Sequence, residues 1–140
     1  MCTAFLHGIL PEEVCLHFPP GYKGKPGHCF RLRKSIYGLV QSPRCFAQTL
    51  HKALLNMGFS QSKADPCLFH IRRGTSQLSI ASFVDDILMA TNDDKLLSWF
   101  KSTLSKSFKC DDLGPLRYYL GMEITQHPTT GVNENVFWTC

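Results

Sequence analysis

The stretch LSIASFVDDILMA, residues 78–90, decides the fold class of this chain. It holds two apolar runs, Leu78–Val84 and Ile87–Ala90, which are separated by Asp85 and Asp86 alone. Two residues are enough for a hairpin turn, whereas a connection between parallel strands needs a dozen or more. The stretch therefore predicts two antiparallel strands with both aspartates at the tip of their hairpin.

Helical patterns flank the hairpin on both sides, over residues 43–58 and 94–108. Apolar residues recur there at helical spacing, and Asn92 or Asp93 suits the capping position of the second helix. The two apolar stripes consist of Phe46, Leu50, Leu54 and Met57, and of Leu97, Phe100, Leu104 and Phe108. Stripes of this kind are typical of helices that bury one face against a sheet.

Shorter apolar segments predict the other strands. These are Glu13–Phe18, Cys29–Leu32, Cys67–Ile71, Tyr118–Thr125 and a last strand that begins at Val136–Trp138. Strands and helices in this order, with a hairpin among them, predict an α+β fold. We expect a mostly antiparallel sheet with two helices packed on one face.

Composition narrows the class of protein. The net charge of +4 is compatible with nucleic-acid binding without establishing it. The seven cysteines include no C-x-x-C pair, which favours reduced thiols over a zinc site or a disulfide framework. No apolar run approaches the roughly 20 residues that span a bilayer, so we expect no membrane association.

The adjacent carboxylates of Asp85 and Asp86 are the main candidate site. Like charges between two apolar strands repel each other, and the turn has no glycine to make it comfortable. A divalent cation would relieve the repulsion, and two such ions can drive an in-line displacement. The alternative is a solvated turn, because Asp93-Asp94 and Asp111-Asp112 are also acidic pairs, which we interpret as caps and exposed charge.

Motifs along nearly the whole chain then point to a family. Phe83-Val84-Asp85-Asp86 resembles the Tyr-Val-Asp-Asp box of reverse transcriptases, and KSIYGLVQSPR at 34–44 resembles the K-S-L-Y-G-L-K-Q-S/A-P-R signature of their copia-type retrotransposon branch. Other matching segments are Ala4–Gly8, Pro19–Tyr22, Gly58–Phe59, Ala64–Phe69, Asp112–Gly114 and Tyr119–Ile124. By these motifs the chain is identified as a member of the copia-type reverse transcriptases.

The resemblance implies a fold and an activity. Residues 1–140 would form a partial reverse transcriptase domain, mostly palm, without the start of the fingers, the thumb or RNase H. The intact parent Pol polyprotein would be an RNA-directed DNA polymerase that uses two-metal nucleotidyl transfer. Asp85 would hold both Mg²⁺ or Mn²⁺ ions, and Asp86 would be a supporting catalytic carboxylate and metal ligand.

The resemblance also implies binding residues and partners. Nucleotide-binding residues would be Tyr37, Gly38, Gln41 and Pro43. Nucleic-acid-binding residues would be Lys34, Arg44, Leu120 and Gly121. The parent's partners would be an RNA template, a DNA primer, deoxynucleoside triphosphates and its own remaining segments. Its location would be intracellular and cytoplasmic, in a virus-like particle.

Departures from the family pattern limit what we expect of this chain. Met1 falls where the family has the valine after its first catalytic aspartate, so that aspartate would precede residue 1. Val40 replaces a usual lysine and Phe46 a usual tryptophan. We therefore expect an incomplete metal site and no polymerisation by the chain alone. The alternatives are a non-catalytic nucleic-acid-binding remnant and a degraded transposon product without activity.

Overall fold

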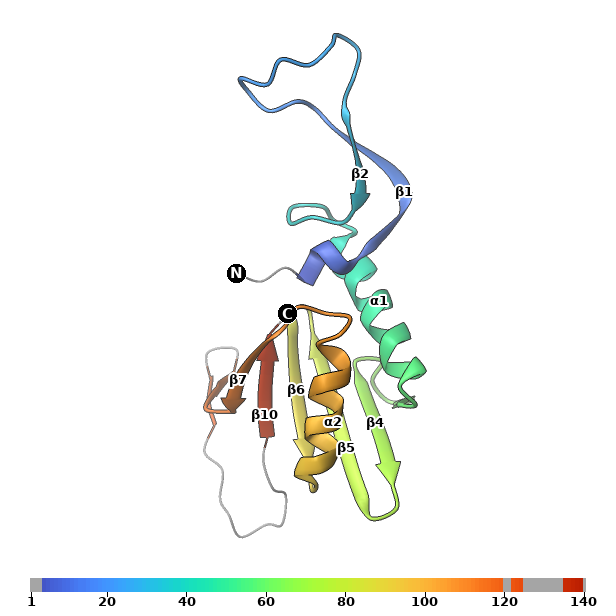
Figure 1. The fold of residues 1–140 in the computed structure, drawn as a ribbon, viewed down its shortest axis with the longest axis vertical. Coiled ribbons are helices and arrows are strands. Elements are labelled where there is room, and N and C mark those ends of the chain that lie inside the picture. Colours follow the sequence, from blue (N-terminus) through green and yellow to red (C-terminus); the bar gives the residue numbers. More distant parts are fainter. Residues whose placement is uncertain (1–3, 120–121, 125–134, 140) are drawn as a thin grey trace.

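The computed structural model describes residues 4–119, 122–124 and 135–139. Its centre is a six-stranded sheet in the order β3-β4-β5-β6-β10-β7, and every neighbouring pair of strands is antiparallel (Figure 1). The strands are β3 Ser60–Gln61, β4 Leu68–Arg73, β5 Ser76–Phe83, β6 Asp86–Thr91, β7 Asp111–Pro115 and β10 Asn135–Thr139. The α+β class with a mostly antiparallel sheet is confirmed.

The predicted hairpin joins β5 to β6, with its turn one residue earlier than expected. Phe83 pairs with Asp86, so the turn consists of Val84 and Asp85. Asp86 is the first residue of β6 rather than part of the tip. The shift follows from strand pairing, because cross-strand register sets the turn and local hydrophobicity does not reveal it.

Two helices accompany the sheet: α1 Ser42–Asn56 and α2 Asp94–Leu104. Asp93 caps α2 as predicted, because its carboxylate accepts the N–H groups of Lys95 at 2.8 Å and Leu96 at 3.4 Å. The expectation that α2 runs to residue 108 is wrong. The chain leaves the helix after Leu104, yet Phe108 in the following turn is still buried in the core.

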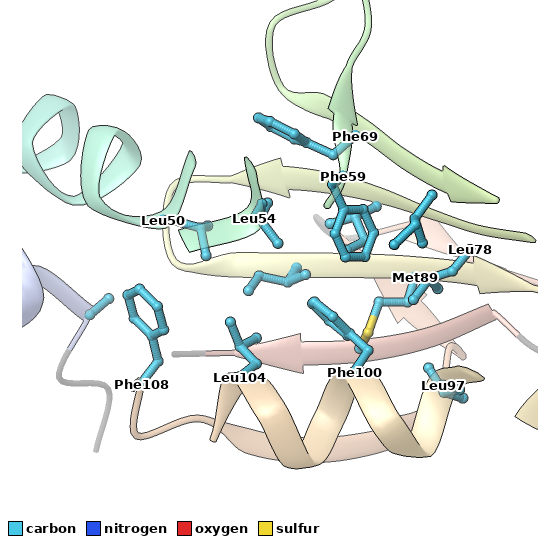
Figure 2. Packing of buried hydrophobic residues seen from close by; sticks show 14 of the residues in the cluster. Leu50, Leu54, Phe59, Phe69, Leu78, Met89, Leu97, Phe100, Leu104 and Phe108 are labelled. Carbon is cyan, nitrogen blue, oxygen red and sulfur yellow. The ribbon is translucent and has the colours of Figure 1, made fainter. Parts of the chain in front are cut away.

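The core lies between one face of the sheet and both helices. Alternate residues of β5 and β6 point into it, as the two-residue period of a strand requires. The cluster includes Leu78, Ile80, Ile87 and Met89 from the sheet, Leu50 and Leu54 from α1, and Leu97, Phe100 and Leu104 from α2. Figure 2 shows these side chains converging between α2 and the strands. The expectation that both helices pack on one face is met by this shared core.

A separate hairpin extends away from the sheet (Figure 1). It consists of β1 Ile9–Leu16 and β2 Phe30–Lys34, preceded by the short 3-10 helix η1 Ala4–His7. In its loop the rings of Phe18, Tyr22 and Phe30 contact one another with centroids 4.8 to 5.0 Å apart. We call residues 9–34 the arm.

Two further expectations need correction. Tyr118–Thr125 is not one strand, because β8 Tyr118–Tyr119 pairs antiparallel with β9 Met122–Glu123. An apolar pattern alone does not distinguish one strand from two that fold back on each other. The thiols are not all reduced either: Cys110 is disulfide-bonded, whereas Cys15, Cys29, Cys45 and Cys67 are free. Spacing in the sequence reveals only local cysteine pairs, so a longer-range bond escaped it.

The start of a strand at Val136–Trp138 is confirmed by β10, which lies between β6 and β7. Strands β3 and β7 were not predicted. Among the described residues, no helix combines the length and the apolar character that crossing a membrane requires.

Candidate functional site

The candidate site is built on the turn between β5 and β6. Asp85 and Asp86 are half-buried there. Val84 has a φ of 55°, a left-handed conformation that β-branched residues rarely adopt. Such strain persists only where the surroundings impose it, and here the paired strands on either side define a two-residue turn. The backbone that presents Asp85 is therefore held in one shape.

Tyr37 reaches this turn from the loop before α1. Its hydroxyl donates a hydrogen bond to Oδ2 of Asp85 at 3.4 Å, which is long and therefore weak. Its ring lies against the Phe5 ring, with centroids 4.3 Å apart. More than half of the Tyr37 side chain remains exposed, so the ring also offers a surface to a ligand.

Buried serines hold the loop that carries Tyr37. Ser35 donates its hydroxyl to the Phe5 carbonyl, and Ser42 donates its hydroxyl to the Ile36 carbonyl. The Ser35 N–H also donates to the Gly8 carbonyl at 3.0 Å. A Cβ on Gly8 would lie 2.4 Å from the Ser35 hydroxyl oxygen, so only glycine permits this approach of η1 to the loop.

The other predicted nucleotide-binding residues follow Tyr37 directly. Gly38 is exposed with a φ of 93°, and nothing lies within 4 Å of where its Cβ would be. Gln41 caps α1, where its carbonyl accepts the N–H of Cys45 at 3.0 Å. Pro43 is exposed in the first turn of the helix. The loop and the helix start thus present these residues on one continuous stretch of surface beside Tyr37.

Tyr119 in β8 approaches the same turn from the other side. Burial raises the pKa of its phenol, and the negative charge of Asp86 adds to the increase. Each of the two carboxylates therefore has a tyrosine near it, Tyr37 for Asp85 and Tyr119 for Asp86. The predicted nucleic-acid contacts Leu120 and Gly121 lie outside the described residues.

Lys34 and Arg44, the other predicted nucleic-acid contacts, are exposed. Lys34 ends β2 opposite Ile9. Burial lowers the pKa of His7, and the positive charge of Lys34 lowers it further. Neither Lys34 nor Arg44 takes part in an ion pair within the part of the chain that the structure describes. Both are thus open to an anionic ligand.

The donors at the turn suit a hard, hydrated cation. Mg²⁺ commonly binds one or two carboxylates and keeps several waters, which Asp85 and Asp86 can provide for on a half-buried turn. Over residues 4–119, 122–124 and 135–139, no three His, Cys, Asp or Glu side chains gather into a metal centre. The described residues therefore supply two carboxylates of a metal site.

Sequence reasoning missed three features of the site. It gave no role to Phe5, although Phe5 belongs to a matched motif and its ring supports Tyr37. It did not foresee the left-handed Val84 or the approach of Tyr119 to Asp86. An aromatic residue in a matched motif was a usable signal for Phe5, whereas the other two features depend on register and tertiary packing.

Comparison with known proteins agrees with this site. Residues 1–134 match the family described as reverse transcriptase (RNA-dependent DNA polymerase). The chain belongs to the reverse transcriptase family. Its copia-type relatives include the retrovirus-related Pol polyprotein from transposon RE1 of Arabidopsis thaliana, which is 41% identical over 129 residues. The corresponding polyprotein from transposon TNT 1-94 of Nicotiana tabacum is 37% identical over 131 residues.

These relatives are much longer than this reverse transcriptase segment. Each match covers 91% of the chain, but only 9% of the RE1 polyprotein and 10% of the TNT 1-94 polyprotein. A putative transposon Ty5-1 protein of Saccharomyces cerevisiae is 29% identical over 126 residues, which is 89% of the chain and 41% of that protein. No solved structure matches the chain.

Proposed function

We propose that this chain is a palm segment of a copia-type RNA-directed DNA polymerase, and that Asp85 and Asp86 are its metal-binding carboxylates. The contact between Tyr37 and Asp85 carries the proposal. It joins the two strongest motifs of the sequence, which lie 48 residues apart, at one exposed point. A solvated hairpin tip would not require a loop pinned by two buried serines to bring a tyrosine to it.

The proposed roles follow from the geometry. Bound Mg²⁺ would supply activation of the primer hydroxyl and stabilisation of the leaving pyrophosphate. Asp85 holds metal from the rigid turn, Asp86 supports it from the start of β6, and the Tyr37 hydroxyl orients the Asp85 carboxylate. The exposed Tyr37 ring with Gly38, Gln41 and Pro43 receives the nucleotide.

The complete reaction belongs to a longer polyprotein. Two-metal transfer needs both ions held about 4 Å apart, and a misplacement of about 1 Å can already cost around a hundredfold in rate. The turn offers two carboxylates from adjacent positions, which leave most of the coordination to water. We therefore propose that the 140-residue chain does not extend a DNA primer on an RNA template by itself.

A chimaera tests this function. The chain replaces the matching segment of the RE1 polyprotein, and primer extension is measured beside the chain alone. We expect activity in the chimaera and its loss in Asp85→Asn, whereas Asp94→Asn, an exposed carboxylate at the start of α2, leaves it unchanged. Activity that survives Asp85→Asn would refute the assigned site. Extension by the chain alone that disappears in Asp85→Asn would refute the claim that it is inactive by itself.

The arm favours nucleic-acid binding as a second function that needs no catalysis. It carries five exposed basic residues against the acidic pair Glu12 and Glu13. They are Lys23, Lys25, Arg31, Arg33 and Lys34. Phosphate contacts of this kind make affinity fall steeply with salt. A fluorescence anisotropy titration with a primer–template at two salt concentrations tests it, and salt-independent affinity would speak against the arm.

A further inference from the structure

Two free cysteines lie at the base of the loop in the arm. Cys15 in β1 pairs with Arg31 of β2, and Leu16 pairs with Phe30. Cys29 directly precedes Phe30, so the hairpin brings it diagonally across from Cys15. Both thiols are free and exposed, and the Cys15 thiol is hydrogen-bonded to Cys29.

The surroundings of this thiol pair are polar and fixed. Arg31 Nε forms an ion pair with Glu13 Oε1 at 3.0 Å, directly beside Cys15. The hydrogen bond to Cys29 raises the pKa of Cys15, followed by smaller effects of burial and nearby charge, which Arg31 partly offsets. The proton is thus kept on Cys15, which makes Cys15 the slower nucleophile of the pair.

We propose that Cys15 and Cys29 form a reversible disulfide across the arm when a low-molecular-weight disulfide such as oxidised glutathione is the oxidant. Nothing in the polymerase reaction requires this bond, so the proposal stands independently of the proposed function. It assigns a covalent modification site to a part of the chain distant in sequence from Asp85 and Asp86.

The reaction proceeds by two thiol–disulfide exchanges. The Cys29 thiolate attacks one sulfur of oxidised glutathione, forming a mixed disulfide and releasing one reduced glutathione. Cys15 then loses its proton and attacks the Cys29 sulfur, forming the Cys15–Cys29 bond and releasing a second reduced glutathione. Two protein thiols are oxidised and one glutathione disulfide is reduced, so electrons and protons balance.

The bond would close a loop that has little else to order it. Residues 17–29 lie outside the strands, and their apolar contacts are those among Phe18, Tyr22 and Phe30. A cross-link at the base of such a loop restricts the conformations open to it. Cys67 offers a comparison, because it is free and exposed but lies in the turn before β4, where its N–H donates to Asp65.

Peptide mapping of the full chain tests the bond. After incubation with oxidised glutathione, trypsin without reductant cleaves after Lys23 and Arg31 and spares the bond between Lys25 and Pro26. We expect peptide 1–23 joined to peptide 24–31, and the two separate after dithiothreitol. The joined species persists in Cys67→Ser and is lost in Cys29→Ser.

Cys15→Ser provides the decisive comparison, because peptide 1–23 also contains Cys2. Loss of the joined peptide in Cys15→Ser supports the proposal. Retention of the joined peptide in Cys15→Ser would identify Cys2 as the partner and overturn it. Glutathione attached separately to Cys15 and Cys29, without a joined peptide in the unsubstituted chain, would overturn it as well.

Discussion

The left-handed conformation of Val84 leads to a prediction whose sign differs between two valines. At an ordinary position, glycine is less stable than alanine by about 0.5–1 kcal/mol, because it loses more conformational freedom on folding. At a left-handed position, the Cβ of any L-residue costs roughly 1–2 kcal/mol, which glycine avoids. With a φ of 55° at Val84, we expect Val84→Gly to be more stable than Val84→Ala.

The size of the effect is the difference between these two terms. It favours glycine over alanine at position 84 by about 0.5–1 kcal/mol. Comparing Gly with Ala removes nearly the same side chain twice, so the lost contacts of the half-exposed valine largely cancel. Val40 is the matched control, because it is 97% exposed and, among described residues, Val84 is the non-glycine residue with positive φ. There alanine should be favoured by about 0.5–1 kcal/mol.

Urea denaturation of the four variants, followed by circular dichroism, measures both differences. Equal slopes are required, so that changes in midpoint report stability alone. The opposite signs at the two positions are the expected result. If alanine is more stable than glycine at both positions, the turn does not hold Val84 in the left-handed region, and the argument for a rigid support under Asp85 is wrong.

Three further predictions concern the metal, the acid limit and the core. Weak Mg²⁺ or Mn²⁺ binding should be lost in Asp85→Asn, and calorimetry that finds equal affinity in both chains would contradict the site. The hydrogen bond from Ser76, followed by backbone N–H bonds, lowers the pKa of Asp93 below 3.8. Its stabilisation is therefore present above the unfolded pKa and lost as pH falls through the folded one. Asp93→Asn keeps the capping acceptor and should remove that part of the acid dependence, as pH-dependent melting would show. Leu104→Ala should destabilise by about 2–5 kcal/mol because Leu104 is fully buried, against about 1 kcal/mol for the half-exposed Leu55→Ala in urea melts.

Local chemistry explains why the hairpin and the helices were predictable. Residues 78–90 alternate inward and outward on a half-buried strand, and two residues leave room only for a tight turn. Asp93 is a strong capping residue followed by an apolar stripe, so the start of α2 was evident. The end of α2 was not, because Phe108 is buried for reasons of tertiary packing that the helical period imitates.

The candidate site was predictable only in its motifs. Asp85, Asp86 and Tyr37 were selected by resemblance, and the structure brings Tyr37 to Asp85. What anchors them was beyond reach, because the hydroxyls of Ser35 and Ser42 bind backbone carbonyls whose positions depend on the whole fold. Pairing between distant segments, such as β10 with β6, likewise has no signature in local periodicity.

The place of β10 between β6 and β7 has a consequence for synthesis on the ribosome. Asn135 pairs with Ala90 and Thr139 with Asp86, so β6 gains its second neighbour only after residues 92–134 have been translated. At about 5–20 residues per second this takes roughly 2–9 seconds. Throughout that interval the nascent chain presents an unpaired strand edge, a template to which strands of other chains can add. Crowded polysomes should therefore produce more misassembled protein than dilute translation does.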